Sequence, residues 1–130
     1  MIETLLTQVR DHETRQVLGE CVVTLFRRWG LDDIDQAALL GMRASAPLHN
    51  GEAVPDDPLV LARVGHLLAI DRALHALYRY APRERDGWVT SSDPHLDGRT
   101  PLSIMLDHGL AGIVAVREQL DAAVTALNKG

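Results

Sequence analysis

Apolar side chains recur at three- and four-residue spacing along the first part of the chain, which is the period of an amphipathic α-helix. One run predicts a helix from Glu13 to Trp29, and Gly30 then supplies a residue suited to the left-handed end of a helix. A second run predicts a short helix that Asp32 caps and that stops at Gly41. The two runs together predict a helix hairpin with a tight connection.

Residues 42–57 break this pattern. Pro47 and Gly51 oppose a long helix there and leave room for one or two turns at most. Helical spacing then resumes, with Asp57 as the capping residue and Pro58 at the first helical position, where its missing N–H costs nothing. We therefore expect a second group of helices from residue 58 onward.

The middle of this second group is less regular. Asp71 is expected to restart the chain into a separate helix, and the Ala81-Pro82 pair is expected to interrupt that helix. A short turn is then expected to run through Trp88.

A polar loop follows and leads directly into a helix start. Thr100 can cap that helix with its hydroxyl, and Pro101 suits its first position. Gly109 is expected to stop this helix in a left-handed conformation, and a long final helix is expected over residues 110–127. The segment therefore predicts a rigid loop on the shoulder of a helix.

The whole pattern contains no convincing strand, repeat or low-complexity tract, and it predicts an all-α fold. The proline- and aspartate-rich stretch before residue 58 is the best candidate for a boundary between two lobes, 1–56 and 57–130. A single cysteine excludes an internal disulfide. Because Cys21 lies in an apolar helical run, we expect a buried small hydrophobe in a reducing cytosol.

The formal net charge is −5, and residues 1–56 contribute most of it, with 5 arginines against 9 acidic residues. Such a chain matches phosphate backbones poorly, so DNA binding needs a local basic patch, a basic partner or a dimer. No apolar run approaches the roughly 20 residues of a membrane helix, and Met1–Arg10 lacks the basic start of a signal peptide. We expect a cytoplasmic protein that does not enter the membrane.

Candidate chemistry is sparse, and the six histidines show no zinc-ligand spacing. Asp93, His95 and Asp97 alternate in one loop and could clasp a cation, as a small metal-dependent enzyme would require. Asp93 before Pro94 and Asp97 before Gly98 are also typical of turns, the interpretation that we favour. The sequence thus predicts a protein that is not an enzyme and that uses no cofactor or metal.

The first lobe has the pattern of a helix-turn-helix, with the first helix and turn over Leu31–Met42. The slot for the recognition helix contains Pro47 and few cations. The pattern fits either a motif that contacts DNA or a degenerate one that is kept for dimerisation. The residues available for DNA contact are Arg43, Ser45, His49 and Asn50.

Three segments resemble the Xre/MbcA/ParS antitoxin family, whose members join an Xre-like helix-turn-helix lobe to a C-terminal toxin-binding domain. The first segment pairs Arg28–Leu31 with Ala37–Gly41, and the second is the helical run Leu61–Ile70. The third consists of Trp88 and Pro94 followed by the Gly-Arg-Thr-Pro-Leu run that ends at residue 102, and it is the most specific. The resemblance covers roughly residues 15–127.

The resemblance implies the antitoxin of a type II toxin–antitoxin system, which binds a RES-domain toxin that consumes NAD and blocks its active site. It also implies a homodimer formed through the first lobe, and repression of the chain's own operon by binding operator DNA. The toxin-facing residues that it implies are Gly98, Arg99, Thr100, Pro101, Arg117 and Lys129.

Arg99 is the charged anchor that we favour in this set, because arginine is common among interface hot spots. Its alternative role is local, either bonding to loop carbonyls or pairing with Asp93 or Asp97. A second function also stays open, that of a DNA-binding transcriptional regulator that acts mainly through the first lobe.

Overall fold

The computed structural model describes residues 11–129, so the expectation about Met1–Arg10 lies outside the described residues. This part of the chain contains six α-helices and two 3-10 helices but no strand, which confirms the all-α fold. Within it, no helix combines the length and the apolar character needed to cross a bilayer. The elements are α2 (His12–Trp29), α3 (Asp33–Leu40), α4 (Ala46–His49), α5 (Pro58–Leu77), α6 (Pro82–Gly87), η1 (Trp88–Thr90), η2 (Pro94–Leu96) and α7 (Pro101–Lys129).

The helix hairpin of the first lobe forms as expected. Gly30 closes α2 at φ 69°, and Gly41 closes α3 at φ 70°, so both helices end in the left-handed region that favours glycine. The Asp32 carboxylate accepts a hydrogen bond from the Asp35 backbone N–H at 2.8 Å and caps α3. The interrupted stretch that follows holds a single helical turn, α4.

Two expectations about the second group of helices are wrong. Asp71 does not restart the chain, because α5 continues from Pro58 to Leu77. Its carboxylate instead accepts two hydrogen bonds from the Arg28 guanidinium of α2, at 3.0 and 2.8 Å. The helix is interrupted before Pro82, as expected, since α5 ends at Leu77. The expected turn before Trp88 is instead the short helix α6, which begins at Pro82 because proline suits the first position of a helix.

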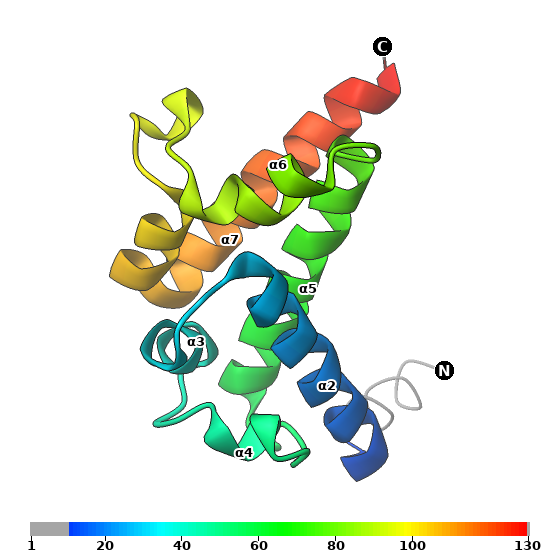
Figure 1. The fold of residues 1–130 in the computed structure, drawn as a ribbon, viewed down its shortest axis with the longest axis vertical. Helices are drawn as coiled ribbons and strands as arrows, with labels where there is room; N and C mark the ends of the chain where they lie inside the picture. Colours follow the sequence, from blue (N-terminus) through cyan, green and yellow to red (C-terminus); the bar gives the residue numbers. More distant parts are fainter. Residues whose placement is uncertain (1–10, 130) are drawn as a thin grey trace.

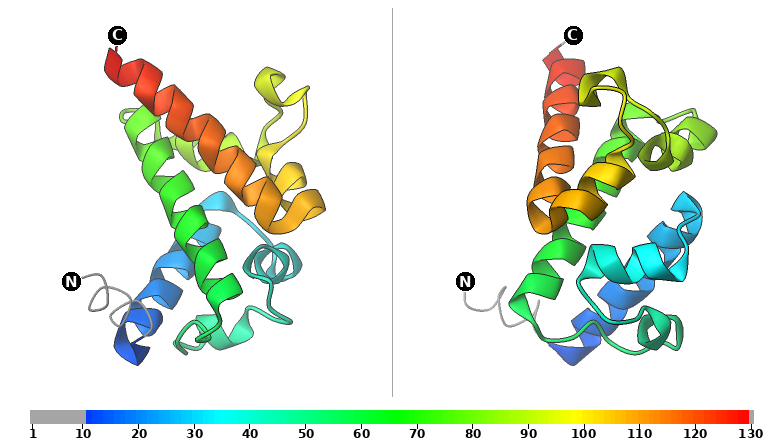
Figure 2. Two further views of the ribbon diagram at one scale, coloured as in Figure 1. Left: turned by 180° about the vertical axis from the view of Figure 1, so that it is seen from behind. Right: turned by 90° about the vertical axis from the view of Figure 1, so that its left-hand side faces the viewer.

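Helix α5 is the central element of the fold, as Figure 1 shows. Helices α2, α3 and α4 gather around its N-terminal half, and α6 lies at its C-terminal half. The most extensive helix–helix packing is between α5 and α7. Seen from behind, these two helices converge toward their C-terminal ends (Figure 2, left).

One hydrophobic core joins α2, α3, α4, α5, η1 and α7, so packing crosses the predicted boundary between two lobes, and that boundary stays a prediction. Phe26 and Trp29 from α2 contact each other as tilted rings 6.4 Å apart. Cys21 is exposed, contrary to expectation, because α2 turns the neighbouring Val22 side toward the core instead. The fully buried large side chains are Val22, Leu25, Phe26, Leu39, Leu40, Val54, Val64, Leu67, Ile70, Leu74, Met105 and Ile113.

Ion pairs reinforce the packing of α2 against α5 and α6. The hydrogen bonds to Asp71 raise the pKa of Arg28, which also lies 3.6 Å from Asp86. Arg85 donates to Asp86 at 3.0 Å, and this hydrogen bond lowers the pKa of the Asp86 carboxyl. The first lobe is thus bound to the second by charge as well as by apolar contact.

Helix α7 bends sharply at Gly109, where a left-handed stop was expected, but the helix continues beyond it, and the ψ of Gly109 differs from that of the left-handed caps Gly30 and Gly41. The Gly109 backbone has φ 59° and ψ −136°, a conformation open to glycine but strained for other residues. Beyond the bend, Gly112 is buried against the backbone of Ile104. Arg63 of α5 lies against the bend and also donates to the Leu39 carbonyl at the end of α3. The bend sets the direction of the shoulder relative to α5.

Candidate functional site

The loop before α7 is closed by its own hydrogen bonds. The Asp93 N–H donates to the Arg99 carbonyl at 3.1 Å, and the Gly98 N–H donates to the Asp93 carbonyl at 3.1 Å. The Asp93 carboxylate accepts from the His95 N–H at 2.8 Å. Asp97 and Gly98 both have positive φ, at 56° and 76°, and turn the chain back on itself. The loop is therefore ordered by short-range contacts before any partner binds.

The shoulder at the start of α7 follows directly. The Thr100 hydroxyl accepts from the Ser103 N–H at 3.1 Å and caps the helix, and Pro101 is buried at its first position. Arg99 forms an ion pair with Asp107, about two turns further along α7. Its local partner is thus neither Asp93 nor Asp97, because the Asp93 carboxylate faces the loop backbone instead. Arg99 and Asp107 are both exposed, so solvent screens this pair.

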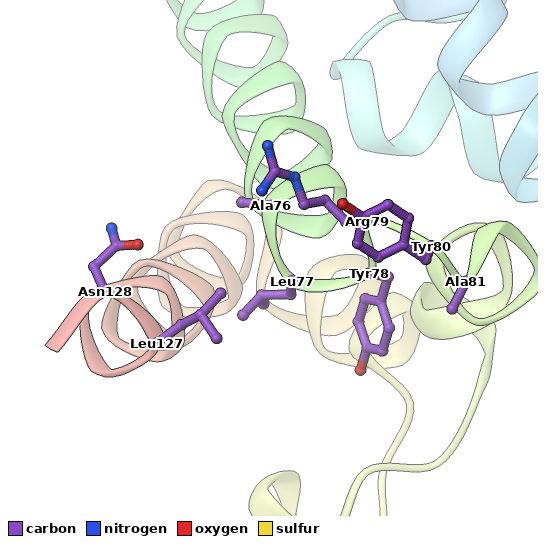
Figure 3. Close-up of a pocket in the computed structure, with 8 residues that line it drawn as sticks. All are labelled: Ala76, Leu77, Tyr78, Arg79, Tyr80, Ala81, Leu127 and Asn128. Carbon is purple, nitrogen blue, oxygen red and sulfur yellow. The ribbon is translucent and has the colours of Figure 1, made fainter. Parts of the chain in front are cut away.

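A hollow of about 790 Å³ lies where α5 and α7 converge at their C-terminal ends (Figure 3). Leu127 of α7 points toward Leu77 of α5 across it. Tyr80 is 91 % exposed and Leu127 is 55 % exposed, so solvent reaches part of the lining. The full lining is Ala76, Leu77, Tyr78, Arg79, Tyr80, Ala81, Leu127 and Asn128.

A second hollow, of about 510 Å³, adjoins the first, because Leu77 and Tyr78 line both. Its other walls are Trp88, the loop residues 92–95, and one side of α7 around Leu120. Sequence reasoning missed this surface. The available signal was the position of both tyrosines of the chain next to the Ala81-Pro82 break, where a helix end exposes side chains.

The six toxin-facing residues expected from the resemblance do not converge on one point. Gly98, Arg99, Thr100 and Pro101 lie together at the N-terminal end of α7, and Lys129 is exposed in its last turn. The straight part of α7, 110–129, is about 30 Å long at 1.5 Å per residue. Arg117 lies midway and donates to His66 Nδ1 of α5 at 2.9 Å. These residues mark the length of α7 rather than a compact site.

The four residues expected to contact DNA surround the single turn of α4. Arg43 and Asn50 are exposed, and His49 is tied to α3 by a 2.7 Å hydrogen bond between its Nε2 and Gln36 Oε1. Ser45 is only 2 % exposed, so its hydroxyl does not face solvent. Four residues are too few to lie along a major groove as a recognition helix does.

The loop residues Asp93, His95 and Asp97 do not form a cation site. Among residues 11–129, no three histidine, cysteine, aspartate or glutamate side chains lie close enough together to hold a metal ion. The Asp93 carboxylate caps the short helix η2, and Asp97 closes it in the left-handed region. Turn formation accounts for both aspartates.

A family model of known proteins matches the segment that contains the closed loop and the shoulder. Residues 73–123 match the model of the antitoxin Xre/MbcA/ParS C-terminal toxin-binding domain. The matched segment runs from the C-terminal end of α5 to six residues before the end of α7 and includes the closed loop, the shoulder and Arg117. Most of both adjoining hollows also lies within it.

The chain is also 32 % identical over 99 residues to the uncharacterized protein y4oB of Sinorhizobium fredii strain NBRC 101917 / NGR234. That alignment covers 73 % of this chain and 74 % of the relative, so the two proteins are similar over most of their lengths. The chain therefore belongs to the Xre/MbcA/ParS antitoxin family and is the antitoxin of a toxin–antitoxin system, with its toxin-binding domain in the C-terminal helices.

Proposed function

We propose that this antitoxin neutralises a RES-domain toxin that consumes NAD, and that it does so by covering the entrance to the toxin's active site. In this proposal the antitoxin acts by binding alone and performs no reaction. The loop and shoulder over residues 93–101, together with the outer side of α7, form the contact surface.

The observation that carries the proposal is the internal closure of the shoulder. Its backbone is fixed by the Asp93–Arg99 and Gly98–Asp93 hydrogen bonds and by the Thr100 cap. A surface that is ordered before binding loses little conformational entropy when it fills a concave site. Arg99 is exposed, and its partner Asp107 is exposed too, so the guanidinium can exchange this pair for a group on the toxin at small cost.

The test is whether the antitoxin inhibits NAD consumption by a RES-domain toxin, taken from the genes that neighbour its own. Full-length antitoxin is expected to abolish NAD loss at a one-to-one ratio, and Arg99→Ala is expected to raise the concentration for half inhibition about tenfold. Arg27→Ala removes an exposed arginine from α2 and serves as the matched control. Undiminished NAD loss with excess wild-type antitoxin contradicts the proposal.

We also propose that the antitoxin forms a homodimer through its first lobe. A hollow of about 450 Å³ there is lined mainly by apolar side chains, including Ala37, Ala38 and Met42. Ile34 at the edge of this hollow is 79 % exposed. Contact with a second copy of the chain would bury this apolar side chain. Ile34→Glu is expected to convert the dimer into a monomer in light scattering after gel filtration. A monomeric wild-type protein at micromolar concentration contradicts this.

We propose further that operator binding belongs to the assembled complex rather than to the isolated chain. Arg43 is the exposed arginine of the α4 region, but it also lines the hollow assigned to the dimer, and the lobe has a net charge of −4. The isolated chain therefore has too little positive charge there to bind phosphates. In a gel-shift assay at low salt, DNA upstream of the operon should shift with the antitoxin–toxin complex and not with the antitoxin alone. A shift by the antitoxin alone supports the regulator alternative instead.

A further inference from the structure

We propose that a cleft between α5 and α7, lined by His66, Arg72 and Arg117, is a carboxylate-binding site that receives an acidic side chain of the toxin. This inference rests on the antitoxin's binding to its toxin and adds a specific contact to it. The cleft has a volume of about 490 Å³. Its complete lining is Ala62, Gly65, His66, Leu68, Ala69, Arg72 and Arg117.

The charge of this cleft is opposite to that of the molecule. The chain carries a net charge of −5, yet two arginines and a histidine line the cleft and no acidic residue does. Arg72 is exposed and makes no hydrogen bond or ion pair with any residue of the described chain. A guanidinium that is left without a partner beside a second one is a site for an anion.

The contact between Arg117 and His66 leaves N–H groups of both side chains able to donate hydrogen bonds to such an anion. A guanidinium can only donate, so the 2.9 Å contact makes His66 Nδ1 an acceptor and leaves the imidazole proton on Nε2. Arg117 also lies 3.4 Å from Asp121, but that carboxylate is 54 % exposed, and an exposed i, i+4 pair holds the guanidinium weakly. The cleft therefore offers several N–H groups and no acceptor of comparable charge.

Small residues form the base of the cleft and leave space above the helix backbone. They are Ala62, Gly65 and Ala69, which lie on the same side of α5. A Cβ built on Gly65 meets nothing within 4 Å, which shows that space stands open above it. A short acidic side chain on a docked partner can therefore enter between Arg72 and Arg117 without moving α5 or α7.

A protein carboxylate fits this site better than a free anion does. The cleft is shallow and its arginines are solvated, so a small anion from solution gains little on binding. A carboxylate that a docked toxin carries into the cleft has already lost its freedom of movement, and the interface around it excludes water. Arg117 lies within the segment that matches the toxin-binding domain, and Arg72 directly precedes that segment in the sequence.

The test measures the affinity of the toxin for the full-length antitoxin by biolayer interferometry. Arg72→Gln and Arg117→Gln are each expected to raise Kd at least tenfold, mainly through faster dissociation, because the lost pair is desolvated in the complex. Arg72→Lys keeps the charge but loses the planar fork, and it is expected to fall between wild type and Arg72→Gln. Arg27→Gln on α2 removes the same charge from a residue outside the lining of the cleft and controls for long-range attraction.

The outcomes are distinct. Failure of the wild-type antitoxin to bind the toxin overturns both the proposed function and this inference. Tight binding of the wild type, with Arg72→Gln and Arg117→Gln within twofold of Arg27→Gln, overturns the inference alone. Inorganic phosphate is the probe for a free-anion site: if millimolar phosphate binds the wild-type antitoxin but not Arg72→Gln, while Arg72→Gln leaves the Kd for the toxin unchanged, the site takes a small anion rather than a protein carboxylate, and the inference is wrong.

Discussion

Gly112 is the position where one added methyl group should damage the fold most directly. A Cβ built there would lie 3.0 Å from the Ile104 carbonyl carbon, and closer still to its oxygen. Ordinary contact begins at 3.4 Å, so the residues before the bend must retreat by about 1 Å. Met105, which is buried in the core on that arm, would have to move with them.

Two opposed effects decide how much Gly112→Ala changes the free energy of unfolding, namely overpacking and helix propensity. Forcing extra volume into a packed site costs about 1–3 kcal/mol, and the obstacle here is backbone that cannot rotate away, which favours the upper end. Alanine regains about 1 kcal/mol through its higher helix propensity. We expect Gly112→Ala to lower the free energy of unfolding by about 2 kcal/mol.

The assay is urea unfolding followed by far-UV circular dichroism. Gly65→Ala is the matched control, because Gly65 is also helical but has open space around its added methyl. That variant should gain about 0.5–1 kcal/mol from propensity alone. If Gly112→Ala also unfolds at the same or a higher urea concentration than wild type, the argument from backbone contact at the bend is wrong.

Three further substitutions test other contacts by the same unfolding assay. Arg63→Met removes the donor that satisfies carbonyls at the end of α3 and should cost about 1–2 kcal/mol; no loss would show that water replaces it fully. Thr100→Ala should cost about 1 kcal/mol through the lost cap, whereas Thr100→Ser should cost little. The lowered pKa of Asp86 means that its ionised form stabilises the fold above the ordinary carboxyl pKa, and that this contribution fades as pH falls through the lowered value. Asp86→Asn should therefore make stability less dependent on acid pH, and an unchanged pH profile would contradict this.

The helix boundaries were predictable where local chemistry decides them. Gly30, Gly41 and the Thr100-Pro101 pair mark ends and starts through backbone conformation and capping, which depend on a few neighbouring residues. Asp71 shows where that reasoning fails. In the sequence, Asp71 resembles the capping residue of a new helix. In the structure, Asp71 lies inside the continuous helix α5, and its carboxylate binds Arg28, which is 43 residues earlier. Such a long-range partner is invisible to local pattern.

The candidate site was predictable only in part. The shoulder could be inferred because its loop residues interact with each other, and the pattern there is specific. The pairing of Arg99 with Asp107 needed the helix direction after Pro101. The cleft of Arg72 and Arg117 joins two helices that are distant in sequence, and no periodicity within either helix reveals that they face the same space.

The continuous core and the Arg28–Asp71 pair have a consequence for how such proteins evolve. Helix α2 completes the burial of α5, so neither half of the chain carries a finished interior of its own. Recombination near residue 57 between diverged relatives should yield chimaeras in which the buried surfaces of the two halves no longer fit each other. New toxin specificities are therefore expected to arise through point substitutions on α7 and its shoulder rather than through exchange of whole halves.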